Sequence, residues 1–113
     1  MEGAESETLL VLTTLPEREA ALKLARALVE KRLAACVNIL SGCTSVYRWQ
    51  DNLEHAEEVP LLIKTRAGRY AELEAAIRSL HPYEVPEIIA VPVVQGLADY
   101  LGWVAEETAI AIG

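Results

Sequence analysis

The order of apolar patterns along this chain predicts an α+β fold of the ferredoxin-like type, with elements in the order βαββαβ and a further helix at the C-terminus. Short β-branched runs alternate with segments of helical periodicity, and turn residues separate them. Two right-handed crossovers place both long helices on one face of such a sheet. The strands are apolar nearly throughout, so the other face needs a cover, and packing against copies of the same chain is the simple solution.

The first strand and helix follow from a short stretch near the N-terminus. Thr8–Thr14 is an apolar, β-branched run that predicts a strand buried on both faces. Thr14 and Glu17 have the spacing of a capping box, and Pro16 would stand in the first turn of the helix. We expect this helix to end near residue 32 or 33.

The middle of the chain predicts a long bent hairpin between the second and third strands. The second strand covers residues 35–40, and Ser41-Gly42 indicates a bend or bulge rather than a chain reversal. The hairpin turns at Asp51-Asn52, and its returning strand runs to Thr65. Proline cannot donate to a strand ladder, so Pro60 marks an edge or a bulge on that strand.

The last third of the chain predicts a helix, a strand and a helix. The apolar stripe of the first helix runs from Tyr70 to Leu80, and His81-Pro82 ends it because a residue before proline avoids the α region. Glu87–Pro92 is the fourth strand, and Asp99–Thr108 reads as a short helix.

Length, charge and cysteine content limit the class of protein. The 113 residues predict one domain over 8–113 that needs no metal to fold, preceded by a flexible tail over 1–7. The net charge of −7 argues against nucleic acid and against an anionic membrane surface as partners. There is no signal-peptide pattern and no membrane-length apolar run. Cys36 and Cys43 match no zinc spacing, and we interpret both as reduced thiols in a cytoplasmic protein.

Five stretches of the chain, in this order, resemble the CutA divalent-cation tolerance family: KRLAACVN at 31–38, TSVYRW at 44–49, IKT at 63–65, HPYEVPE at 81–87 and YLGW at 100–103. The resemblance covers about residues 8 to 108. It implies a ferredoxin-like protomer, a tight homotrimer similar in architecture to the PII signalling proteins, and a role in tolerance to copper and other divalent cations. It implies no enzymatic reaction, and the sequence contains no nucleophile or phosphate-loop motif.

The resemblance also implies soft metal ligands, of which this chain retains two. The family's proposed ligands include a cysteine where this chain has Thr13 and a first histidine where it has Leu80, so His81 and Cys36 are left. A neutral imidazole or a thiolate could bind copper or another divalent cation. The alternatives are a histidine placed at a helix C-terminus, where positive charge is favoured, and a buried cysteine acting as a small hydrophobe.

Oxygen ligands and a cleft between subunits complete the candidate site. Glu58 and Glu87, with Glu57 and Glu84 beside them, could bind a hard divalent ion, or they could simply be solvated. One protomer offers too few ligands for a tetrahedral site, so a strong site would need more than one subunit.

The residues expected at an intersubunit cleft are mostly aromatic side chains with a polar atom: Lys64, Tyr83, Trp103, Tyr47 and Trp49. For the two hairpin aromatics among them, trimer packing is favoured over ligand contact. Two other functions stay open. One is a PII-like regulator that binds a small anionic metabolite or a protein partner at the cleft, with Lys64 as its anchor, and the other is an acid–base enzyme that uses His81.

Overall fold

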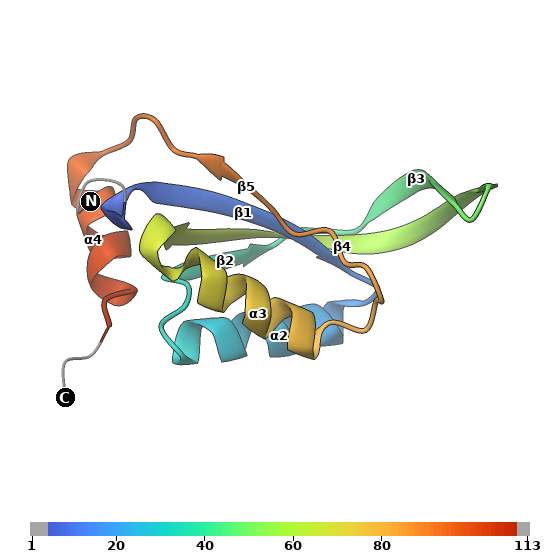
Figure 1. Cartoon of the computed structure of the whole chain (residues 1–113), viewed down its shortest axis with the longest axis horizontal. Coiled ribbons are helices and arrows are strands. Elements are labelled where there is room, and N and C mark those ends of the chain that lie inside the picture. The colour runs from blue at the N-terminus through green and yellow to red at the C-terminus, as the bar shows by residue number, and fades with distance from the viewer. Residues whose placement is uncertain (1–4, 111–113) are drawn as a thin grey trace.

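The computed structural model describes residues 5–110 and consists of one antiparallel sheet with helices packed against it (Figure 1). The strands are β1 (Thr8–Leu15), β2 (Cys36–Ile39), β3 (Cys43–Trp49), β4 (Asn52–Arg66) and β5 (Ile89–Pro92). The helices are α2 (Arg18–Glu30), α3 (Tyr70–Leu80) and α4 (Ala98–Glu107), and a short 3-10 turn, η1 (Ala67–Arg69), leads into α3.

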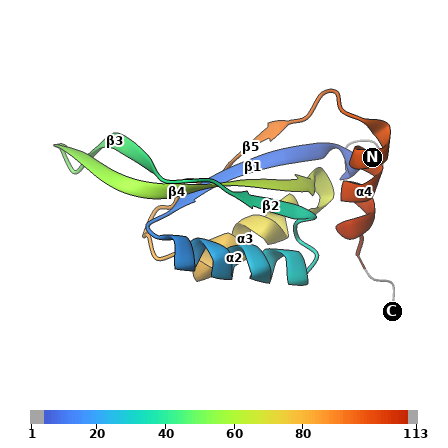
Figure 2. The same cartoon turned by 180° about the vertical axis from the view of Figure 1, so that it is seen from behind.

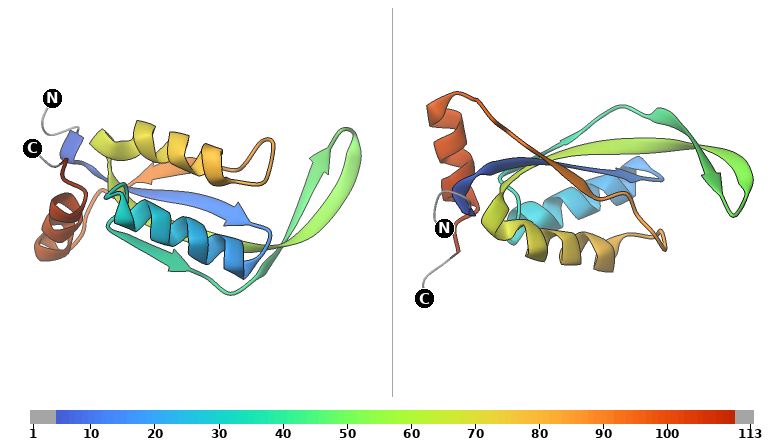
Figure 3. Two further views of the ribbon diagram at one scale, coloured as in Figure 1. Left: turned by 90° about the horizontal axis from the view of Figure 1, so that it is seen from below. Right: turned by 45° about the horizontal axis from the view of Figure 1, so that its top comes forward.

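The sheet has five strands in the order β2-β4-β1-β5, and β3 continues the pairing along β4 beyond β2. Every pair is antiparallel. Helices α2 and α3 lie side by side on one face, and α4 lies across the end of the sheet near the N-terminus (Figures 2 and 3). This is the predicted ferredoxin-like arrangement with its long hairpin and C-terminal helix, so the fold prediction is confirmed.

The hydrophobic core lies between the sheet and helices α2 and α3. Alternate residues of the two central strands point into it because successive side chains of a strand face opposite sides. The fully buried core side chains include Val11 and Leu15 of β1, Leu61 and Ile63 of β4, Leu28 of α2, and Leu73 and Ile77 of α3.

The opposite face of the sheet, which we call the open face, also presents apolar side chains. Leu10, Leu12 and Leu62 are half-buried there, and Ile89 and Val91 of the edge strand β5 are exposed. Their placement follows from the strand register, which sets Leu10 opposite Val91 and Leu12 opposite Ile89. The apolar pattern on both strand faces is therefore present as predicted.

A β-bulge separates the sheet from the outer part of the hairpin. Ile39 pairs with Leu61 and Cys43 pairs with Glu58, so three residues on one strand oppose two on the other. The N–H of Leu40 donates to the carbonyl oxygen of Pro60 at 3.0 Å. The N–H and C=O of a strand residue point to the same side of the strand. Since the carbonyl of Pro60 faces Leu40, its nitrogen, which has no hydrogen to donate, also faces the bulge. The bulge expected at Ser41-Gly42 and the break marked by the proline are one feature.

The predicted capping box is wrong. Strand β1 continues through Leu15, which pairs with Val59, so Thr14 lies in the strand and Pro16 precedes the helix. Glu17 stands at the N-cap of α2, and no side-chain hydrogen bond caps that terminus. Pairing with β4 extends the strand through the residue that the local pattern assigned to a cap.

The hairpin turn is also displaced by one residue from the prediction. Gln50 and Asp51 form a two-residue loop with φ values of 49° and 67°, and it closes the pair between Trp49 and Asn52. Two consecutive positive φ values are typical of a type I′ turn, whose twist matches that of the flanking strands.

The chain termini fall partly outside the described residues. The tail predicted over 1–7 includes residues 1–4, and the predicted domain ends with residues 111–113, neither of which the structure describes. The carbonyl oxygen of Glu7 accepts a hydrogen bond from the N–H of Ala67 at 2.8 Å. No helix within residues 5–110 is long and apolar enough to cross a membrane.

Candidate functional site

Most of the predicted site residues gather in two clusters at different points along β4. The junction cluster, where the hairpin leaves the sheet, consists of Thr14, Glu58, His81 and Tyr83. The α4 cluster, near the other end of the strand, consists of Cys36, Asn38, Lys64, Tyr100 and Trp103. Glu58 and Lys64 are six residues apart on one strand, which corresponds to roughly 20 Å.

A buried carboxylate is the centre of the junction cluster. Glu58 is 8% exposed, and its Oε2 accepts hydrogen bonds from the Tyr83 hydroxyl at 2.8 Å and from Thr14 Oγ1 at 3.2 Å. These three residues come from β4, from the loop after α3 and from β1. Two hydroxyl donors to a single oxygen satisfy a charge that would otherwise be costly to bury.

His81 supports this carboxylate indirectly. It is 8% exposed and forms the C-cap of α3, where its N–H donates to the carbonyl oxygen of Ile77 at 2.8 Å. The N–H of Tyr83 donates to its Nδ1 at 3.1 Å, so Nε2 bears the proton and donates to the carbonyl oxygen of Thr14 at 2.6 Å. Both ring nitrogens are thus used within the protomer, and a metal at His81 would have to displace one of these bonds.

Tyr83 keeps its proton over a wide pH range. Burial, followed by the hydrogen bond to Glu58 and the negative charges of Glu58 and of ionised Tyr47, raises the pKa of Tyr83 to about 12. Its ring also lies 4.8 Å from the ring of His81, centroid to centroid. The Tyr83 hydroxyl therefore remains a donor to Glu58 under ordinary conditions.

The α4 cluster joins the open face of the sheet to helix α4. Cys36 and Lys64 are opposite each other in the strand register, and Lys64 Nζ donates to Asn38 Oδ1. Burial raises the pKa of Tyr100, and the nearby Cys36 side chain raises it further. The ring of Tyr100 lies 5.7 Å from that of Trp103. Helix α4 thus places Tyr100 beside the thiol of Cys36, with Trp103 next to Tyr100 on the same helix.

The remaining predicted residues lie outside both clusters. Tyr47 and Trp49 share one face of β3, in the part of the hairpin that extends away from the sheet (Figure 1), and both are exposed. Tyr47 contributes to the raised pKa of Tyr83, which links it to the junction cluster. Glu87 is exposed just before β5.

The described residues do not offer a complete metal site. Within residues 5–110, no three His, Cys, Asp or Glu side chains lie close enough to hold one ion together. Glu58 and His81 are in one cluster but already have hydrogen-bond partners, while Cys36 and Glu87 lie elsewhere. Both cysteines are free. The described part of one protomer therefore does not fit a closed coordination shell for a resident metal.

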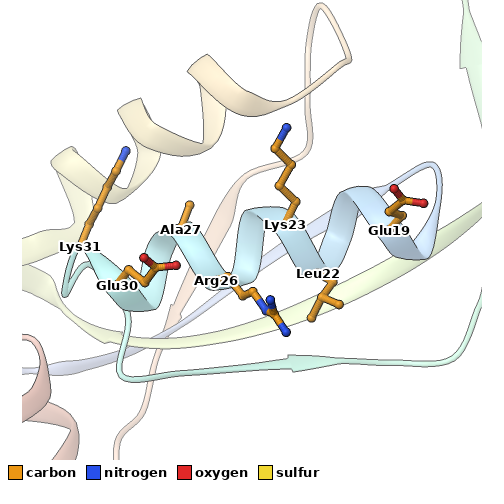
Figure 4. A pocket seen from close by; sticks show the side chains of 7 residues that line it. All are labelled: Glu19, Leu22, Lys23, Arg26, Ala27, Glu30 and Lys31. Carbon is orange, nitrogen blue, oxygen red and sulfur yellow. The ribbon is translucent and has the colours of Figure 1, made fainter.

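A surface hollow of about 720 Å³ lies away from both clusters, along the outer side of α2 (Figure 4). Lys23 and Lys31 extend toward one side of the helix in that view, and Leu22 and Arg26 toward the other. Its lining combines both signs of charge on one helix surface and contains no predicted site residue.

Three residues of the clusters were not expected from the sequence. Asn38 and Tyr100 belong to the stretches that resemble the CutA family, so their presence in those stretches could have suggested them. Thr14 gave no usable signal, because its contact with Glu58 spans 44 positions of sequence and depends on strand pairing.

Comparison with known proteins gives consistent matches over the whole domain. The family model described as CutA1 divalent ion tolerance protein matches residues 9–107. The divalent-cation tolerance protein CutA of Thermus thermophilus is 49% identical over 98 residues, which cover 87% of this chain and 95% of that protein. Protein CutA of mouse is 48% identical over 95 residues, 84% of this chain and 54% of that protein, so the chain spans about half the length of the mouse relative.

Solved structures agree with these sequence matches. The Cut A1 structure from Thermus thermophilus superposes with a TM-score of 0.88 at 47% identity, covering 90% of this chain and 99% of that chain. The CutA structure from Xylella fastidiosa gives a TM-score of 0.89 at 43% identity, covering 91% of this chain and 99% of that chain.

Proposed function

The chain belongs to the CutA1 divalent ion tolerance protein family, and from this premise we propose that it acts as a non-enzymatic homotrimer that binds copper or a related divalent cation weakly. Family membership is the observation on which this proposal depends. We expect the binding to be weak because residues 5–110 of a single protomer supply an incomplete set of ligands. Water and groups from a second subunit would have to complete the coordination.

Charge supports an interaction with cations. The net charge of −7 raises the local concentration of positive ions around the protein. Glu58 and His81 are the two ligand-type side chains that one cluster contains, and Glu87 and Cys36 are the separate candidates. A metal bound at the junction cluster would compete with the hydrogen bonds of Tyr83 and Thr14, which lowers its affinity.

The open face supports the homotrimer. Its apolar side chains include Ile89 and Val91, and the exposed aromatics Tyr47, Trp49 and Trp103 lie on the hairpin and on α4. Exposed apolar and aromatic side chains of this kind are typical of protein interfaces. Assembly would bury these side chains and would bring candidate ligands of different subunits together.

Calorimetric titration with Cu(II), Cu(I) and Zn(II) tests direct binding. We expect weak heats with the wild-type protein that decrease in His81→Ala and in Cys36→Ser. Tyr70→Phe is a suitable control, since Tyr70 bonds to Glu74 within α3 and lies outside both clusters. Absence of heat from every metal, with all variants equal to the wild type, would remove direct binding from the proposal while leaving family membership unaffected.

The alternative of an anion-binding regulator has less support. It would use Lys64 as its charged anchor, but Lys64 Nζ already donates to Asn38. An anion would have to displace that amide oxygen.

Residence in the cytoplasm is also part of our proposal, and it is supported by two free thiols, which are typical of reducing compartments.

A further inference from the structure

The outer part of the hairpin is a two-stranded ribbon that extends from the sheet. We call residues 43–58 the hairpin arm; it is drawn at the right of Figure 1. The last pair between β1 and β4 joins Leu15 to Val59, so the β4 residues of the arm pair only with β3. Isolated two-stranded ribbons are marginally stable and twist strongly. Within one protomer, the direction of the arm therefore depends on what holds it where it leaves the sheet.

The backbone at that junction is a weak connection. The bulge interrupts the ladder between β4 and the strand opposite it, and Pro60 has no N–H to donate there. On the side of β4 that faces the bulge, the described contacts are the bond from Leu40 N–H to the Pro60 carbonyl oxygen and a long one, 3.4 Å, from Arg18 Nη1 to the Leu40 carbonyl oxygen, while on its other side β4 stays paired with β1 through Val59. None of these contacts reaches the arm itself.

Glu58 is the first arm residue beyond the bulge on β4, and its side chain reaches back to the sheet. Among the hydrogen bonds of residues 5–110, those of Thr44 with Glu57 and of Cys43 with Ser45 stay within the arm. Glu58 instead accepts from Tyr83 and Thr14, which belong to the body of the domain. A buried carboxylate with two hydroxyl donors is a strong directional contact.

We propose that Glu58, Tyr83 and Thr14 form a latch that fixes the hairpin arm against the sheet. The arm is docked while the carboxylate is bonded, and without these bonds it becomes a ribbon that pivots at the bulge. His81 is a positioning residue of the latch, because its Nδ1 holds the backbone of Tyr83 and its Nε2–H holds that of Thr14. This inference concerns the motion of the arm and does not depend on metal binding.

Hydrogen exchange followed by mass spectrometry, with the full chain in its native assembly, tests the latch. Tyr83→Phe removes only the hydroxyl, and Glu58→Gln removes only the charge. Hydrogen bonds to charged groups stabilise a contact more than neutral ones do, so their loss should make local opening of the arm more frequent. We therefore expect amides of residues 43–58 to exchange about tenfold faster in both variants. Amides of residues 59–66, which pair with β1, should keep the wild-type rate.

Tyr70→Phe is the matched control. Its hydroxyl donates to Glu74 at 2.8 Å, the same length as the bond from Tyr83 to Glu58, but the pair lies within α3. This control should leave exchange in the arm unchanged. The double variant Tyr83→Phe/Glu58→Gln should exchange in the arm no more than about twofold faster than the faster single variant, since both changes open the same contact.

Two results would overturn the latch. One is unchanged exchange in the arm of Tyr83→Phe and Glu58→Gln, which would show that other contacts, including those of an assembly, fix the arm without it. The other is equal acceleration over residues 43–58 and 59–66, which would show a loss of overall stability rather than release of the arm.

Discussion

Thr13 and Cys36 lie on opposite faces of the sheet. Thr13 is 1% exposed and points toward the helices with Val11 and Leu15. Cys36 is opposite Lys64 in the register and lies on the open face. Soft ligands at these two positions cannot meet on one ion within a protomer, because the sheet separates them. Burial of Thr13 on the helix side also leaves its hydroxyl without a hydrogen-bond partner among residues 5–110, and the resulting loss of stability can be measured.

Replacement of Thr13 by valine should stabilise the protein. Within the described part of the chain, Thr13 Oγ1 is the buried side-chain polar atom that lacks a hydrogen-bond partner. Valine has nearly the same shape and removes the desolvation cost of the hydroxyl, so we expect the free energy of unfolding to rise by about 1 kcal/mol. Urea denaturation measures this change. The control Thr65→Val should instead destabilise, because Thr65 Oγ1 donates to the carbonyl oxygen of Leu33 at 2.7 Å.

Replacement of Arg32 by glycine should also stabilise the protein. Helix α2 ends in a Schellman motif, in which the N–H of Leu33 donates to Leu28 and that of Arg32 to Val29. Arg32 occupies the left-handed position with φ of 59°, where a side chain costs about 1 kcal/mol relative to glycine. Its ion pair with Glu107 is exposed and contributes little.

The matched variant Arg32→Ala separates these two effects. Alanine removes the ion pair with Glu107 but keeps the Cβ atom in the left-handed conformation. We expect chemical denaturation to show a gain of roughly 0.5–1 kcal/mol for glycine and no gain for alanine. Equal stability of the two variants would mean that the backbone conformation at Arg32 is not strained.

The stability of the fold should decrease at high pH through Tyr83. Its folded-state pKa of about 12 lies above the ordinary value of 10.0, so folding favours the protonated phenol. This contribution is fully present below pH 10 and is lost as the pH rises from 10 toward about 12. Spectrophotometric titration of the tyrosines should show the component near pH 12 in the wild type and in Tyr70→Phe, and its loss in Tyr83→Phe. Persistence of that component in Tyr83→Phe would assign it to another tyrosine.

Introduction of a charge on the open face should disrupt assembly. Ile89 is 52% exposed in the protomer, so lysine at this position is tolerated by a monomer but costly in a buried interface. We expect sedimentation of Ile89→Lys to report a particle near 12.4 kDa, and the wild type to report about three times that mass. Leu22→Lys is the control, since Leu22 is 46% exposed on the outer side of α2. An unchanged mass for Ile89→Lys would exclude β5 from the interface.

Patterns of sequence were sufficient for the order and type of the elements. The apolar run at Thr8–Thr14 and the proline after His81 identified a strand and a helix end because their causes are local. The bend at Ser41-Gly42 and the break at Pro60 were both expected, but only strand pairing showed that they are the same bulge. Pairing also moved Thr14 out of its expected cap and into β1.

The candidate site was harder to predict from the sequence than the fold, because its contacts join segments that are far apart along the chain. Tyr83 and Glu58 were each expected to matter, one in a cleft and one as a metal ligand, yet they bond to each other across 25 positions. Cys36 and His81 were grouped as soft ligands by residue type, and the structure places them in different clusters. Residue chemistry identifies candidates, but distance between them is a property of register and packing.

The sequence by itself determined that this chain forms a ferredoxin-like domain of the CutA family with apolar side chains on both faces of its sheet. Hydrophobic periodicity and local turn chemistry act over a few residues, so they can be read along the chain. Only the tertiary structure decided that Glu58 is buried against Tyr83 and Thr14, and that the sheet lies between Thr13 and Cys36. These relations depend on which strands pair and in what register, and pairing is fixed when the whole core forms.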